Sequence, residues 1–203
     1  MAFPDFFNEI PSLRMRDPLA QLLGAAPDGV IEYRYDDVVR LAGHSCPTVA
    51  GAWLSARAGL RALYGDELPE RGGISVSMPD AEDAGVTGVI AQVMTLITGA
   101  AGANGFKGLG GQYARCHLLH FSEAQVRGVR LRRNDNQAAV DVELDTRPVP
   151  ADPMQQQLIR LVVQDLADAA QRVEFGNVWQ DRVRRLLLEH ADDPAVIRVH
   201  NVN

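Results

Sequence analysis

The chain has 203 residues, of which 46% are hydrophobic and 23% charged, a composition typical of a soluble globular domain with one hydrophobic core. Its net charge of −6 argues against affinity for nucleic acid or an anionic membrane surface. The first residues, MAFPDFFNEIPSLRMR, lack the basic and then apolar order of a signal peptide, and no apolar run is long enough to span a membrane, so we expect a cytoplasmic protein.

The first half of the chain predicts short elements followed by a long helix. DPLAQLLG (17–24) is typical of a short helix and IEYRY (31–35) of a strand. At 47–64, Pro47 takes the first helical position and apolar residues recur at three- and four-residue spacing up to Gly65. Much of this helix surface is glycine and alanine, which lets another backbone approach closely.

The next segment, ISVSM (74–78), alternates like a strand and leads to a second helix from Val86 to Ile97, which ends at Gly99. A glycine-rich stretch (99–111) comes next. After it the sequence predicts three strands, at 113–121, 126–133 and 138–145. The last two are expected to be joined by a hairpin turn.

The C-terminal part follows the proline-rich segment 146–153. Apolar spacing predicts one helix through residues 158–173 and another around 178–187, before a short strand, AVIRVH. We therefore expect an α+β fold in which a mixed or antiparallel sheet packs against helices. Residues 1–150 would form the domain, and residues 151–203 a helical extension packed on it.

A histidine and a cysteine stand two positions apart at the start of the helix predicted for 47–64. Cys46 takes the N-cap position, where unpaired backbone N–H groups and the helix dipole stabilise negative charge on sulfur. A thiolate binds metals or attacks electrophiles, and the imidazole of His44 can serve as a second ligand or as a base. The alternative is that Cys46 is a small buried residue and His44 a turn residue.

The other cysteine lies in the strand predicted from YARCHLLHF. Alternation places Cys116 and His120 on one face of that strand and His117 on the other. Two cysteines are too few for a disulfide framework. If the Cys116 face approaches the helix start, a metal site forms; otherwise Cys116 is core and the histidines are rim residues. The candidate metal ligands are therefore His44, Cys46, Cys116, His117 and His120.

Three further segments have simpler interpretations. The acidic loop with Asp80, Glu82 and Asp83 is either a second source of ligands or a cap for the helix that follows. GANGFKG lacks the Gly-Lys-Ser/Thr order of a phosphate loop. VRGVRLRR alternates arginine with apolar residues, as expected of a sheet with one solvated face.

Two stretches resemble the signatures of the FmdE-like family of formylmethanofuran dehydrogenase components: GHSCPTVAGAWLSARAGLRALYG and VTGVIAQVMTLITGAAGANGFKGLGG. The resemblance covers about residues 33–121. It implies an α+β domain like the catalytic domain of glyceraldehyde-phosphate dehydrogenases, frequent dimerisation, and metal ligation by His44 and Cys46. Two cysteines of the family pattern are replaced here, one within Asp83–Gly85 and one by Ala100, so its cysteine-rich site is depleted.

We therefore predict a metal- or metallocofactor-binding protein of this family, accessory to a redox enzyme. The expected metal is zinc, with haem iron as the alternative. We also expect a homodimer in which the 47–64 helix and the 99–111 loop approach the partner. The alternative function is an enzyme that uses the Cys46 thiolate as nucleophile and His44 as its base.

Overall fold

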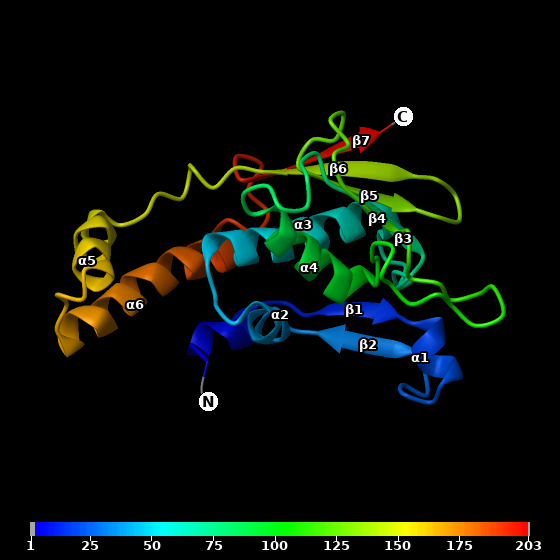
Figure 1. The fold of residues 1–203 in the computed structure, drawn as a ribbon, viewed down its shortest axis with the longest axis horizontal. Coiled ribbons are helices and arrows are strands. Elements are labelled where there is room, and N and C mark those ends of the chain that lie inside the picture. The colour runs from blue at the N-terminus through cyan, green and yellow to red at the C-terminus, as the bar shows by residue number, and fades with distance from the viewer. Residues whose placement is uncertain (1–2, 203) are drawn as a thin grey trace.

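A mixed five-stranded sheet forms one side of the protein in the computed structural model, which describes residues 3–202 (Figure 1). Its spatial order is β4-β3-β5-β6-β7. The pair β3–β4 is parallel, and every other neighbouring pair is antiparallel. The strands are β3 (Ile74–Ser77), β4 (Leu119–His120), β5 (Val129–Arg133), β6 (Ala139–Leu144) and β7 (Ile197–Val202).

Two helices, α3 (Pro47–Tyr64) and α4 (Thr87–Thr98), cover one face of this sheet. Gly59 of α3 lies so close to the sheet that a Cβ there would be 2.8 Å from a methyl group of Leu131. The opposite face is charged: Arg130 and Asp141, which pair across β5 and β6, form an ion pair of 2.6 Å there. The alternation predicted for VRGVRLRR is confirmed, because Val129 and Leu131 are buried and the arginines between and after them are not.

A third layer lies on the far side of α3 and α4 (Figure 1). It contains an antiparallel hairpin of β1 (Leu13–Arg16) and β2 (Val30–Tyr33), preceded by η1 (Asp5–Glu9). The helices α1 (Pro18–Leu22) and α2 (Tyr35–Ala42) flank it. The core fills the space between the layers, and its largest fully buried side chains include Trp53 and Tyr35.

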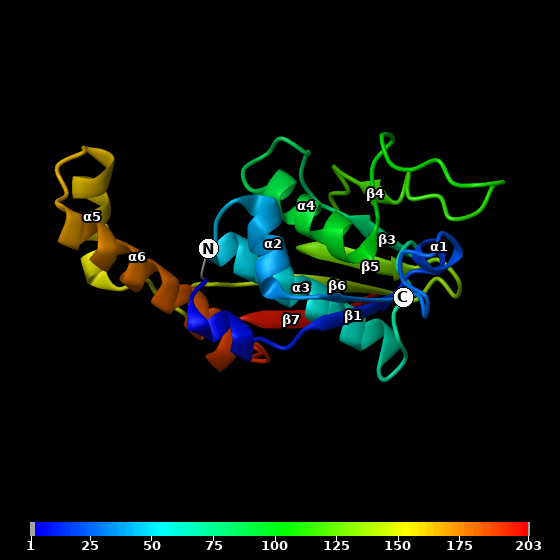
Figure 2. The same ribbon diagram turned by 90° about the horizontal axis from the view of Figure 1, so that it is seen from below.

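The C-terminal part projects from these layers as a helical hairpin, α5 (Pro153–Val163) and α6 (Ala169–Arg184), in both views (Figures 1 and 2). Trp179 and Gln180, in the second half of α6, attach it to the body by donating hydrogen bonds to the carbonyl oxygen of Ser45. A turn of π-helix, η2 (Arg185–Glu189), then leads back to β7 at the sheet edge.

The predicted α+β fold is confirmed, and α3 has the predicted bounds 47–64. Cys46 is its N-cap, Pro47 its first residue, and Gly65 follows its end. Within residues 3–202, no helix combines the length and the apolar character needed to cross a membrane.

The strand predicted for 113–121 is wrong over most of its length, because only Leu119 and His120 pair with β3. The preceding residues bond to the glycine-rich loop instead: Ala101 N–H donates to Arg115 O, and Leu118 N–H donates to Ala101 O. Tyr113 and His117 have positive φ angles, which no strand allows. Cys116 and His117 lie outside the strand, so the strand alternation predicted from sequence does not decide which way their side chains point.

The single helix predicted through 158–173 is also wrong, since two helices meet there. Asp168 accepts a hydrogen bond from Gln171 N–H, and the Gln171 side chain accepts one from Asp168 N–H. This capping box starts α6 in the middle of the apolar pattern.

Candidate functional site

The residues between α2 and α3 hold the His-x-Cys pair in place. Gly43 ends α2 in the left-handed region, at φ 74°, which turns the chain toward α3. The Tyr35 hydroxyl lies 3.0 Å from Ser45 Oγ. Burial raises the pKa of Tyr35 far above its ordinary value, so the phenol stays protonated and can donate to Ser45. Ser45, between the two candidate residues, is thus held through its hydroxyl by Tyr35 and through its carbonyl oxygen by Trp179 and Gln180.

Cys46 caps α3 with its sulfur. The side chain is 9% exposed, and Sγ accepts a hydrogen bond from Val49 N–H at 3.5 Å. Pro47 has no N–H to satisfy, and the sulfur caps the N–H of the third helical residue, Val49, within the first turn. The sulfur therefore lies at the positive end of an 18-residue helix.

His44 is exposed, and its ring is oriented by the backbone. Nδ1 lies 2.9 Å from the carbonyl oxygen of Ala42. Because a carbonyl oxygen only accepts, Nδ1 carries the hydrogen, and in the neutral ring the lone pair is therefore on Nε2. Metal-binding histidines commonly use this arrangement, in which a backbone carbonyl fixes the tautomer and the ring orientation.

Both side chains line one cavity of about 470 Å³, here called the Cys46 cavity. Apolar groups from α3, α4 and α6 form most of its wall. The Arg182 side chain is held at its edge by donating hydrogen bonds to Val149 O and Thr146 O. The lining residues are His44, Cys46, Pro47, Thr48, Val86, Val89, Trp179 and Arg182.

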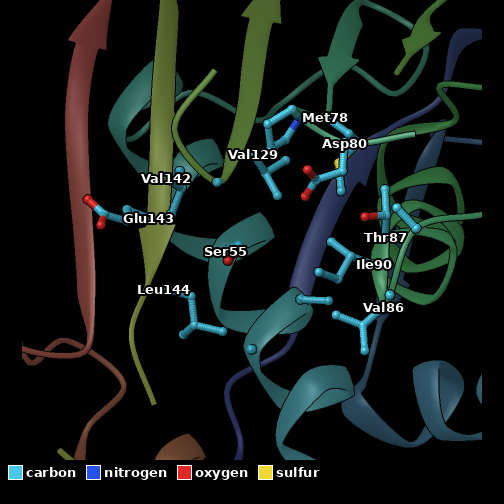
Figure 3. Close-up of a pocket in the computed structure, with 16 residues that line it drawn as sticks. Ser55, Met78, Asp80, Val86, Thr87, Ile90, Val129, Val142, Glu143 and Leu144 are labelled. Atoms are coloured by element: carbon cyan, nitrogen blue, oxygen red, sulfur yellow. The ribbon is translucent and has the colours of Figure 1, made fainter. Parts of the chain in front are cut away.

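A second cavity of about 550 Å³, here called the Ser55 cavity, lies further along α3 between the start of α4 and the sheet (Figure 3). Val86 lines both cavities, so they are neighbours. Ser55 and Thr87, the hydroxyl residues of this cavity, are not among the site residues predicted from the sequence. The available signal was a polar residue, Ser55, on an otherwise small and apolar helix surface.

The other three predicted ligands lie elsewhere. Cys116 is packed on Gly105 in the loop beyond the C-terminal end of α4, whereas the Cys46 cavity touches the first turn of that helix. The 12 residues of α4 span about 18 Å. His117, next to Cys116, and His120, on edge strand β4, are both exposed.

The structure therefore brings His44 and Cys46 together and leaves Cys116, His117 and His120 apart from them. Both cysteines are free thiols. Among residues 3–202, no group of three His, Cys, Asp or Glu side chains is placed to hold one metal ion. The ligand roles of Cys116, His117 and His120 stay predictions.

The acidic loop before α4 does not cap it. The N-cap of α4 is Val86, and no side chain bonds to its free N–H groups in the described chain. Asp80, Glu82 and Asp83 are all exposed. Of these three, Asp80 lines the Ser55 cavity.

No protein-family model matches the sequence, and no curated protein matches it. Among solved structures, a tungsten formylmethanofuran dehydrogenase FmdE-like protein from Syntrophus aciditrophicus aligns with this chain at a TM-score of 0.44 and 14% identity. The alignment covers 84% of this chain and 73% of that protein. Membership of the family stays a prediction.

Proposed function

We propose that the protein binds a metallocofactor whose metal is ligated by His44 and Cys46, with the organic part of the cofactor in the Cys46 cavity. One observation carries the proposal: a histidine with a free Nε2 and a helix-capping sulfur line the same largely apolar cavity. Imidazole nitrogen and thiolate sulfur are the donors that transition metals prefer in proteins.

The number of donors favours iron in a macrocycle over a bare zinc ion. Structural zinc takes four protein ligands in a tetrahedron, two more than this pair provides. Haem iron is held by the macrocycle and needs only one or two axial ligands, for which histidine and cysteine both serve. A volume of about 470 Å³ lies in the range of cofactor pockets.

The charges around the cavity fit an acidic cofactor. The N-terminus of α3 is the positive end of its dipole, and Arg182 lies at the cavity edge with its Nε and Nη2 groups bonded to carbonyl oxygens. A guanidinium has five N–H donors, so Arg182 can also bind a carboxylate substituent. These residues would bind and orient the cofactor, while the Trp179 ring would shield its face from water.

Titration with haemin tests this proposal. The wild-type protein should shift the haem absorption band, and the shift should saturate at one haemin per chain. Loss of an outer-shell partner weakens metal binding by roughly 10- to 100-fold, and loss of a ligand should cost at least as much. We therefore expect His44→Ala and Cys46→Ser each to weaken haemin binding by at least about tenfold.

The chain offers matched controls at the other end of α4, namely His117→Ala and Cys116→Ser. Both variants should bind haemin like the wild-type protein. Unshifted haemin spectra with the wild-type chain would contradict the haem proposal. An equal loss of haemin affinity in all four variants would instead support the ligand set predicted from sequence, with His117 and Cys116 contributed by a second copy of the chain.

The alternative, Cys46 as a nucleophile with His44 as its base, has less geometric support. A general base must lie within hydrogen-bond reach of the group that it deprotonates. In the described residues, Cys46 Sγ bonds to Val49 N–H and the His44 ring bonds to Ala42 O, and no hydrogen bond joins the two side chains. Alkylation of Cys46 that slows markedly in His44→Ala would favour the nucleophile over the ligand.

A further inference from the structure

Two buried hydroxyl groups face the Ser55 cavity without a protein partner. Ser55 on α3 is 3% exposed and Thr87 at the start of α4 is 5% exposed. In the part of the chain that the structure describes, neither side-chain oxygen takes part in a hydrogen bond, and neither is sealed inside the protein. Figure 3 shows both residues on the cavity wall. Buried hydroxyls normally have a partner, so this pair indicates a bound molecule or water.

The carboxylate of Asp80 lines the same cavity as the two hydroxyl groups. Asp80 is exposed at the cavity mouth, and its side chain forms no ion pair within residues 3–202. Figure 3 shows its carboxylate directed into the cavity. Glu143 also lines the cavity, but its side chain is bonded to Arg198 and His200 of β7. Asp80 is therefore the carboxylate available to a ligand.

The rest of the wall is apolar and carries no cation. Gly51 lets Leu144 pack directly on α3 at the cavity wall, since a Cβ on Gly51 would lie 2.1 Å from a methyl group of Leu144. None of the residues that line the cavity is Lys, Arg or His. The apolar side chains of the wall are Ala52, Met78, Pro79, Ala84, Val86, Ile90, Val129, Val142 and Leu144.

We propose that the Ser55 cavity binds a small molecule with an apolar body and one primary ammonium group. The ammonium has three N–H donors and no acceptor. The Asp80 carboxylate would take a charge-assisted hydrogen bond from it, and a hydroxyl oxygen on the cavity wall can accept another. An anionic ligand would meet the Asp80 charge with no cation to offset it. The cavity volume of about 550 Å³ lies in the range of small-molecule sites.

The amine site in the Ser55 cavity is separate from the metallocofactor site in the Cys46 cavity. It rests on Ser55, Thr87 and Asp80, none of which lines the Cys46 cavity. Because Val86 lines both cavities, a molecule in one would lie beside the other. The experiments can nevertheless be separated, since haemin binding needs neither hydroxyl nor Asp80, and amine binding needs neither His44 nor Cys46.

Three probes with one apolar body and different head groups test the ligand class: cyclohexylmethylamine, cyclohexylmethanol and cyclohexanecarboxylate. Each is titrated into the isotope-labelled full chain at pH 7, and binding is followed by the NMR shifts of amides that line the cavity. We expect the amine to bind tightest, the alcohol more weakly and the carboxylate weakest. A carboxylate that binds as tightly as the amine, or an amine that shifts none of these amides, would overturn the proposal.

The loop before α4 supplies a matched pair of variants. Asp80→Asn should weaken the amine by roughly tenfold, the contribution of a hydrogen bond to a charged group, and leave the alcohol nearly unchanged. Asp83→Asn, in the same exposed loop but outside the cavity, should leave both affinities unchanged. Equal amine affinity in Asp80→Asn and wild type would contradict the assignment. Ser55→Leu should fill the cavity and weaken all three probes, and Asp80→Asn keeps the test decisive if Ser55→Leu does not fold.

Discussion

Asp17 is a buried carboxylate that joins three separate parts of the chain. It accepts hydrogen bonds from Leu19 N–H and Ala20 N–H, which cap α1, and from the guanidinium groups of Arg71 and Arg115. Burial raises the pKa of Asp17, but the Ala20 N–H bond, the Arg71 bond and both arginine charges outweigh burial. They hold the pKa below its usual value of 3.8.

The sign of this shift predicts how stability depends on pH. Since the folded-state pKa is lowered, Asp17 contributes stability above pH 3.8, and the contribution is lost as pH falls through the folded-state pKa. Asp17→Asn leaves the Arg115 charge buried and should cost about 3–5 kcal/mol at pH 7. In urea unfolding the difference from wild type should shrink below pH 3.8, whereas Asp28→Asn, at an exposed position, should show a small cost.

Among the elements, the loop 113–118 depends on a glycine that contacts it from another segment. Gly72 has φ +86°, and a Cβ there would lie 1.2 Å from Arg115 Nη1. Gly72→Ala should therefore displace Arg115 and cost clearly more than Gly24→Ala. Gly24 has a similar φ of +74° but open space around its Cα. The backbone term common to both is about 1–2 kcal/mol, and the clash should add roughly 1–3 kcal/mol in chemical denaturation.

Elements with strong local signals were predictable from sequence, and those fixed by distant contacts were not. Pro47 and Gly65 mark both ends of α3. The loop 113–118 looks like a strand, but its conformation is set by Arg115 reaching Asp17, almost a hundred residues earlier. The break before α6 had a local signal, the capping box at Asp168, which the apolar periodicity obscured.

In the candidate site, too, the part fixed by local sequence was predictable and the part assembled by tertiary packing was not. His44 and Cys46 are two residues apart, so their proximity follows from the sequence alone. The Ser55 cavity combines α3, the start of α4 and β6, and only tertiary packing brings these together. For the same reason, spacing did not reveal that Cys116 lies at the other end of α4.

At the scale of the whole molecule, homodimerisation stays a prediction, but the reason offered by α3 does not hold. Gly51 and Gly59 pack on Leu144, Leu131 and Val142 of the same chain. The α5–α6 hairpin instead carries the two most exposed large apolar residues of the described chain: Val163 is 78% exposed and Leu166 67%. Each of these two helices has only one buried residue, Leu158 in α5 and Val183 in α6, so the hairpin would gain from a covering partner.

Light scattering tests this surface. We expect a mass near twice the 22.1 kDa of one chain. Val163→Glu combined with Val173→Glu should shift the protein toward the monomer. The circular dichroism spectrum of the protein should not change, because both side chains are exposed. The same substitution at Leu23, which is also exposed but lies outside the hairpin, serves as the control and should leave the mass unchanged. A wild-type mass near 22 kDa over a broad concentration range would contradict the dimer.

The position of β7 in the sheet has a consequence for folding order. Leu144 of β6 pairs with Ile197 of β7, so residues 145–196, including the whole α5–α6 hairpin, must close as a loop before that pairing forms. Pairings between such distant residues form late, because the loop-closure entropy is lost before the contacts are gained. Until then β6 is an edge strand with unpaired backbone groups, which makes that interval the one in which newly folding chains would aggregate.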